Sequence, residues 1–174
     1  PMRPLFPKDY RNDVTLNNMV MSVDTECRPE LLAMLGSALC ASISDIPFDG
    51  PCATTQIGLI DGEFIVNPSQ KQWAEGDLQL TVASTSKKVI MIEAGANIVP
   101  EDKMLEAIYM AHDINQTIIE FFNKIVAEVG KEKHAYVSCA VPAEMFEAMK
   151  KIVTPEEMEV AVFTDDKQTR EKNI

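Results

Sequence analysis

Residues 44–67 read SDIPFDGPCATTQIGLIDGEFIVN and join a helical pattern to a hairpin pattern. Two prolines and a glycine lie within Ile46–Pro51, a composition typical of a stiff connector. Strands are predicted at 54–60 and 63–66, because Asp61-Gly62 between them suits a tight type I′ turn. This stretch therefore predicts a helix that meets a β-hairpin through a rigid turn.

A helix is predicted before this stretch, over Pro29–Ser44. Proline suits the first helical position, where its missing N–H costs nothing. The residues expected to face the sheet recur at the spacing of a buried helical face: Leu31, Leu32, Met34, Leu35, Ala38, Leu39 and Ser42. Further upstream, the alternating and β-branched residues Asp13–Val23 indicate a strand, which Asn17-Asn18 weaken.

A second hairpin is predicted after a short turn of helix at 68–75. Apolar and polar residues alternate over 78–82, so one face of that strand is expected to be buried and the other wet. The returning strand, Val89–Ile92, is expected to be more deeply buried. The longest helix then runs from Pro100 to about Val129 and ends at Gly130, with this apolar stripe: Met104, Ile108, Ala111, Ile118, Phe122, Ile125 and Val129, interrupted by Asn115.

The elements predict an α/β (α+β) fold in which a mixed or antiparallel sheet of two hairpins is packed by two helices. Two short helices, at 141–152 and 154–165, predict a C-terminal helical appendage with a frayed tail at 165–174. We therefore expect an extended leader at 1–12, an α/β subdomain at 13–130 and a helical segment at 131–174.

The composition excludes several classes of function. The net charge of −11, from 16 basic and 27 acidic residues, is unlike that of a nucleic-acid-binding module, which carries a basic face. No run approaches the ~20 apolar residues of a membrane span, and no secretory leader is recognisable. We expect a cytoplasmic protein without a membrane partner.

The cysteines and histidines give no catalytic or metal-binding pattern. Cys27, Cys40, Cys52 and Cys139 have no C-x-x-C spacing, so we expect reduced thiols and no zinc, with Cys40 on an apolar helix face. His112 and Asp113 point about 100° apart on a helix and cannot face one substrate together. We expect His112 to bond to the sheet or a neighbouring subunit, and His134 to be solvated.

Asp45 and Asp49 flank the rigid connector. Carboxylates held near one another can share a proton or bind a metal, but aspartates also cap helix ends and turns. We interpret both as caps. Neither a phosphate-binding glycine loop nor a Ser/His/Asp arrangement is recognisable, so no catalytic residue is predicted.

The leader Pro1–Pro7 is rich in proline and carries Leu5 and Phe6. This composition predicts a segment laid along sequence that is missing here, so we expect the chain to be a fragment of a longer protein. Arg3, Lys8 and Arg11 form the densest basic group. They are either solvated or packed against the missing sequence, or they contact phosphates along an RNA path.

Several motifs occur in a recognisable order: Arg3-Pro-Leu-Phe-Pro7, Arg11-Asn-Asp-Val14, the helix Pro29–Ser44, Ser44-Asp-Ile-Pro-Phe-Asp-Gly-Pro51, Val66-Asn-Pro-Ser-Gln70, Met91-Ile-Glu-Ala94 and Glu101-Asp-Lys-Met-Leu105. Through about Gly130 the chain resembles the bacterial polynucleotide phosphorylases. The resemblance implies that 13–130 is an RNase PH C-terminal-like subdomain, the back half of the family's first core, and that 131–174 starts its all-helical linker domain.

The resemblance also implies the parent's activity. Family members degrade RNA from the 3′ end with phosphate, release nucleoside diphosphates, add 3′ tails in reverse, use Mg²⁺ and form a ring-shaped homotrimer. The family's catalytic residues belong to its second core, so this fragment is expected to be inactive and to hold no cofactor or metal. Only Arg3 lies in a matched motif near RNA, as a contact candidate. The alternative is a stand-alone, non-enzymatic interaction module with an RNase PH-like fold.

Overall fold

The computed structural model describes residues 1–24 and 26–174. By their contacts, these residues divide into two compact units, Pro1–Val137 and Ser138–Ile174. The elements in chain order are η1 (Arg3–Leu5), α1 (Pro29–Ile43), β1 (Ala53–Ile60), β2 (Glu63–Val66), α2 (Gln70–Glu75), β3 (Leu78–Ser84), β4 (Val89–Ala96), α3 (Glu101–Val129), α4 (Ala143–Ile152), α5 (Pro155–Val162) and α6 (Lys167–Asn173).

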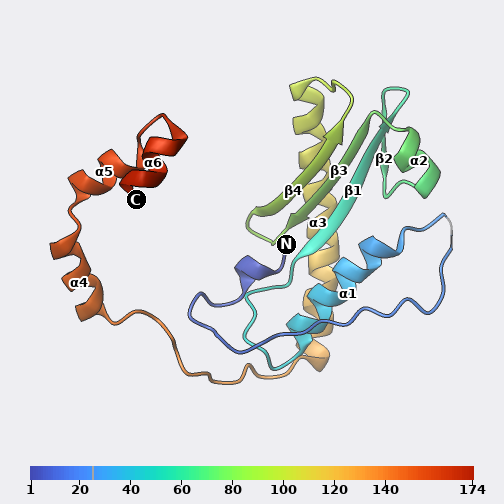
Figure 1. The fold of residues 1–174 in the computed structure, drawn as a ribbon. Helices are drawn as coiled ribbons and strands as arrows, with labels where there is room; N and C mark the ends of the chain where they lie inside the picture. Colours follow the sequence, from blue (N-terminus) through green and yellow to red (C-terminus); the bar gives the residue numbers. More distant parts are fainter. Residues whose placement is uncertain (25) are drawn as a thin grey trace. The chain divides into compact units, whose positions relative to one another are not determined.

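The first unit is built on an antiparallel sheet with the strand order β2-β1-β3-β4, which is four-stranded within the described residues (Figure 1). The long helix α3 packs on one face of β1 and β3. A core of Ile57, Leu59, Leu78, Leu80, Val82, Ala107 and Ala111 fills that interface. The predicted fold class is confirmed, and the sheet is antiparallel rather than mixed.

The Asp61-Gly62 turn is confirmed. Asp61 has φ 51° and Gly62 has φ 83°, so both central residues are in the left-handed region that a type I′ turn requires. The turn sets the register in which Ile60 pairs with Glu63. The turn of this hairpin was therefore predictable from a local dipeptide.

A buried asparagine joins α3 to the sheet. Asn115 is fully buried; its Oδ1 accepts a hydrogen bond from Thr55 Oγ1 at 2.8 Å. Its Nδ2 donates to the Val82 carbonyl at 3.0 Å and to Ser84 Oγ at 2.9 Å. The interruption in the predicted apolar stripe is therefore a satisfied polar contact that positions the helix on two strands.

The strand predicted at Asp13–Val23 is wrong. These residues form no strand, and the side chains of Met19 and Met21 are 82% and 85% exposed. A strand needs a neighbour for its backbone groups, and no strand pairs with this segment in the described part of the chain. The β-strand propensity of these residues therefore does not show whether a neighbouring strand is there to pair with them.

The prediction of which residues of α1 are buried is correct only in part. Small residues do bring α1 close to β1, because Ser37, Ala38, Ala41 and Ser42 are buried. Leu32, however, is 65% exposed, and Cys40 is also exposed, contrary to prediction. Of the large residues predicted to be buried, Leu31 is buried as predicted, and the rest of the buried face consists of small residues.

The second hairpin is confirmed, but its burial differs from the prediction. Thr81 is 6% exposed rather than wet. The returning strand β4 is half-exposed to exposed along its length, and Ile92 is 50% exposed, because β4 lies at the edge of the sheet. Sequence alternation does not tell an edge strand from a central one.

The second unit contains three helices among its described residues. Thr154 and Glu157 form a capping box at the start of α5, and Pro155 lies just inside it as predicted. The tail is not frayed as predicted, because Asp166 caps a further helix, α6, through Thr169 N. The predictions of α4 and α5 are therefore confirmed, and α6 is an additional helix.

Candidate functional site

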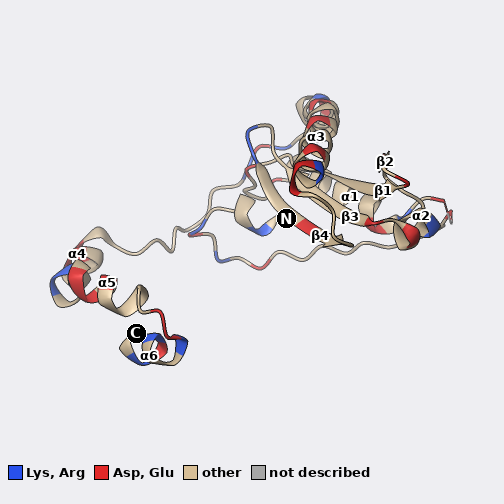
Figure 2. Ribbon diagram, turned by 90° about the horizontal axis from the view of Figure 1, so that it is seen from above, with Lys and Arg blue, Asp and Glu red and all other residues tan. Residues whose placement is uncertain are grey.

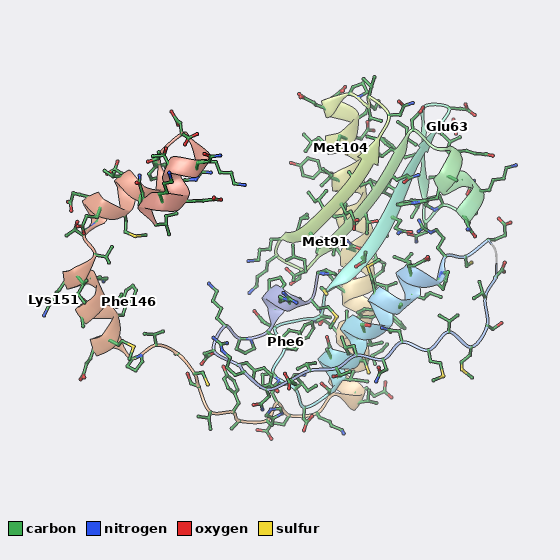
Figure 3. The ribbon with its side chains drawn as sticks, in the orientation of Figure 1. Phe6, Glu63, Met91, Met104, Phe146 and Lys151 are labelled. Atoms are coloured by element: carbon green, nitrogen blue, oxygen red, sulfur yellow. The ribbon has the colours of Figure 1, made fainter. Side chains whose placement is uncertain are left out.

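The leader packs on its own domain. Leu5 is 6% exposed and lies in a cluster with Ala38, Ala41, Phe48 and Cys52. Figure 3 labels Phe6, whose ring lies 5.1 Å from that of Phe48. The Leu5 carbonyl accepts a hydrogen bond from Asp49 N at 2.8 Å. The prediction that Leu5 and Phe6 lack partners within the chain is wrong.

The leader, the connector and the β3–β4 turn enclose a groove of about 640 Å³. It is lined by Pro4, Leu5, Asp49, Gly50, Pro51, Thr85, Ser86, Lys87, Lys88, Val89, Ile90, Ile119 and Asn123. Arg3 directly precedes the lining residue Pro4 and is exposed. The lining residues come from separate segments of the chain, so no local sequence pattern indicates this groove.

Two lysines give this groove its charge. Lys87 and Lys88 are exposed, and neither forms an ion pair within residues 1–24 and 26–174. Thr85 closes the turn that carries them, because its N–H donates to the Lys88 carbonyl at 2.9 Å. Figure 2 colours basic positions at this turn and at η1, in a chain whose net charge is −11. The groove can therefore contact an anion, with Asp49 as an opposing charge.

The connector is closed by Ser44, not by the two aspartates. Ser44 N donates to the Cys40 carbonyl at 3.1 Å, and Ser44 Oγ accepts from Ile46 N at 3.2 Å. Neither Asp45 nor Asp49 accepts a capping hydrogen bond through its carboxylate in the described chain. The interpretation of both as caps is therefore wrong, and both side chains are exposed.

His134 is not solvated as predicted. Its ring Nε2 lies 3.4 Å from Tyr10 Oη, and its ring Nδ1 lies 4.0 Å from the Asp45 carboxylate. The backbone N–H of His134 donates to the Asp45 carbonyl at 2.7 Å. Tyr10 also meets Tyr136 edge to face at 5.1 Å. This aromatic cluster fastens the leader to the chain that follows α3.

Lys133 supports the same junction. Its Nζ donates to the carbonyls of Ala41, Ser42 and Ser44 at 3.1, 2.9 and 2.6 Å. These carbonyls lie at the C-terminal end of α1, where a positive charge stabilises the helix dipole. Burial lowers the pKa of Lys133, and Asp45 opposes that shift. The contacts make Lys133 a cap for α1 rather than a residue that could act on a substrate.

His112 and Asp113 do not form a catalytic pair. His112 is half-buried and contacts Gln116 Nε2 at 3.3 Å, whereas Asp113 is exposed. The expected bond from His112 to the sheet is not made; instead Gln116 donates to the Thr85 carbonyl at 3.2 Å. No group of three or more His, Cys, Asp or Glu side chains is placed to hold a metal ion in the described residues.

Cys52 is the buried thiol of the chain, with 1% exposure. Burial raises the pKa of Cys52, which opposes formation of the reactive thiolate. Cys27, Cys40 and Cys139 are exposed.

Among the residues that the structure describes, no helix combines the length and the apolar character that crossing a membrane requires.

Residues 50–114 match the 3′ exoribonuclease family, domain 2. Over all 174 residues the chain is 72% identical to the polyribonucleotide nucleotidyltransferase of Lachnoclostridium phytofermentans. The identity is 48% to that of Ruminiclostridium cellulolyticum and 47% to that of Halalkalibacterium halodurans. The chain covers 25% of the length of each of these relatives. The whole of this chain therefore matches one segment of these polyribonucleotide nucleotidyltransferases. Within that segment, residues 50–114 are similar to domain 2 of the RNase PH-like exoribonucleases.

Proposed function

We propose that this chain is a non-catalytic segment of a phosphate-dependent 3′→5′ exoribonuclease that also adds RNA 3′ tails. Its role is to complete the scaffold of the first core and to form part of the ring interface of a homotrimer. The observation that carries the proposal is the match of the entire chain to one quarter of named polyribonucleotide nucleotidyltransferases. The domain division at 1–12, 13–130 and 131–174 belongs to the same proposal.

The residues present support a structural rather than a chemical role. Phosphoryl transfer depends on positioned phosphates, cations and metal. In this proposal, Mg²⁺ and the catalytic residues belong to parts of the longer protein outside this chain. Asn115 and the sheet it joins to α3 provide the rigid support that the scaffold role needs.

RNA contact in this segment is assigned to Arg3. Its side chain is exposed on η1, beside the groove that also carries Lys87 and Lys88. Guanidinium and ammonium groups position RNA through phosphates without reading sequence. In the longer protein, replacing Arg3 by alanine is expected to weaken RNA binding and to reduce the salt dependence of that binding. Replacing Lys124, which is exposed on α3, by alanine is expected to change neither.

Assembly of the ring uses apolar surface that the chain leaves exposed. In the first unit, Tyr109 and Phe121 on α3 are 61% and 59% exposed, and Met19 and Met21 more so. An interface with neighbouring subunits would bury these side chains. Sedimentation of the longer protein is expected to give the mass of a trimer. We place this protein in the cytoplasm.

The experiment that tests the function is an assay of the purified 174-residue chain. With poly(A) and radiolabelled phosphate it is expected to release no nucleoside diphosphate, whereas the longer protein releases it in proportion to phosphate. Phosphate-dependent release by the chain alone would contradict the non-catalytic role.

A rival function is a stand-alone interaction module with an RNase PH-like fold. The observation in its favour is that Leu5 is buried against the chain's own residues, so the leader does not need a missing partner. The mass of the protein made from the native gene separates the two. A product of 19.3 kDa would favour the module, and one about four times as large would favour the exoribonuclease.

A further inference from the structure

A second cavity, of about 500 Å³, lies on the polar face of the sheet in the first unit. It is lined by Arg28, Glu30, Met34, Gln56, Trp73, Gln79, Thr81, Glu93, Ala94 and Gly95. These residues come from the start of α1, from α2, and from β1, β3 and β4. Gln56 pairs with Thr81, and Thr81 with Glu93, across neighbouring strands, so polar side chains form a row over the sheet.

The amide of Gln56 is one of two groups left unsatisfied in this cavity's wall. Gln56 is 4% exposed; its Nε2 donates to Thr81 Oγ1 at 3.3 Å, but its Oε1 is buried without a hydrogen-bond partner. Proteins pair nearly all buried polar atoms, so an unpaired one requires an explanation.

Arg28 is the other unsatisfied group. Its guanidinium lies over the Trp73 ring, 4.3 Å from the centroid, and its Nε is 3.8 Å from the Glu30 carboxylate. Its Nη1 is buried and has no hydrogen-bond partner. The arginine therefore covers an aromatic face while one of its N–H groups remains unused, which makes its present position costly to hold.

We propose that this cavity binds a nucleotide, with its base stacked on Trp73 and its phosphate on Arg28. Aromatic faces stack on bases of any sequence, and a glutamine amide offers the acceptor and donor that match a base edge. Arg28 leaves the ring when the base arrives, and its N–H groups pair with the phosphate. Glu30 and Glu93 disfavour ligands of higher negative charge, so a monophosphate fits better than a triphosphate.

The base comes from a free nucleotide or from the end of an RNA strand, which share this chemistry. The proposal does not depend on the proposed function, because it is read from Arg28, Gln56 and Trp73 alone. Its failure would leave the match to the exoribonucleases unchanged, and a catalytically inactive chain can still bind the nucleotide.

Trp73 is the only tryptophan of the chain and reports on its own site. Titration of the 174-residue chain with AMP is expected to quench its fluorescence saturably. Adenosine, without the phosphate, is expected to bind at least about tenfold more weakly, a difference of about 1.4 kcal/mol. Titration with a five-residue oligoadenylate tests the RNA source, and tighter binding than AMP would assign the site to RNA.

Two variants and one control complete the test. R28A is expected to remove the advantage of AMP over adenosine, and Q56L is expected to weaken both. K71A, exposed on the same helix as Trp73, is expected to bind as the unchanged chain does. In the unchanged chain, AMP should also shift the NMR signal of the Trp73 indole N–H, a measurement that needs no variant. Absence of saturable quenching and of that shift with AMP and with the oligoadenylate would overturn the proposal and leave a water-filled cavity.

Discussion

Asn115 shows how a single polar residue fixes the position of a long helix. Apolar contacts along α3 allow the helix to slide or rotate, whereas hydrogen bonds to Thr55, Val82 and Ser84 fit one arrangement. All of these groups are buried, so the bonds do not compete with water. The pattern of the sequence marked the residue as an interruption but could not name its partners, which lie 31 to 60 residues away.

Replacing Asn115 by alanine is expected to destabilise the first unit by about 2–4 kcal/mol, because it leaves buried partners unpaired and opens a cavity. Asn123, exposed on the same helix, is the matched control and should change stability by less than about 0.5 kcal/mol. Urea unfolding followed by Trp73 fluorescence measures both. Equal effects of the two substitutions would show that the buried network does not hold the helix.

The four thiols are expected to differ in reactivity. Burial both hides Cys52 and raises its pKa, so iodoacetamide at neutral pH should modify Cys27, Cys40 and Cys139 well before Cys52. Mass spectrometry of the digested protein gives the extent at each site, and urea should remove the difference. Early modification of Cys52 in the folded protein would contradict its burial.

At the scale of elements, turns and helix starts depend on residues close by in the sequence, whereas strand pairing and strand burial depend on segments that are distant in the sequence. The Asp61-Gly62 hairpin, the α1 start at Pro29 and the α5 start at Pro155 were predictable because turn and cap residues act within a few positions. The failures concern partners: Asp13–Val23 has the residues of a strand without a neighbour, and β4 has apolar residues at an edge.

A pair of identical substitutions tests this account of the hairpin. Gly62 has φ 83°, so alanine there is expected to cost about 1–2 kcal/mol although no atom blocks its Cβ. Gly36 lies exposed within α1, also with open space around its Cβ, and alanine there should stabilise by about 0.4–1 kcal/mol. Thermal unfolding of the two variants should therefore shift in opposite directions, and a shift in the same direction would refute the turn assignment.

The start of α5 is expected to depend on pH. The N–H and hydroxyl of Thr154 hydrogen-bond the Glu157 carboxylate and hold its pKa below the ordinary value. A lowered carboxyl pKa stabilises the folded form above the unfolded pKa of about 4.3, and that contribution is lost as pH falls through the lower folded value.

NMR titration of the Glu157 carboxyl in the unchanged chain and in T154A measures this coupling. The substitution T154A should move the pKa of Glu157 back toward the ordinary value and remove the acid-induced loss of helix at this end. A pKa of Glu157 that is the same in both proteins would show that the capping box does not form in solution.

At the scale of the whole molecule, the sequence indicated the class of fold and the resemblance to the polyribonucleotide nucleotidyltransferases, but it did not indicate the two cavities of the first unit. The groove beside Arg3 joins residues 4–5, 49–51 and 85–90, and the cavity beside Trp73 joins Arg28 to β1, β3 and β4. Such sites form only when distant segments fold together. The motif pointed to Arg3 as a contact candidate, which stays a prediction, whereas no sequence pattern singled out Lys87, Arg28 or Gln56.

The central claim, that this chain supplies the scaffold of an RNA-degrading enzyme without its chemistry, is tested most directly by a chimera. This chain replaces the matching quarter of the Lachnoclostridium phytofermentans protein, to which it is 72% identical. The chimera is expected to form particles of the same size and to release nucleoside diphosphates from poly(A) with phosphate at a rate within about tenfold of the parent, a barrier change below about 1.4 kcal/mol. A chimera of the correct size that has lost phosphate-dependent release would contradict the claim.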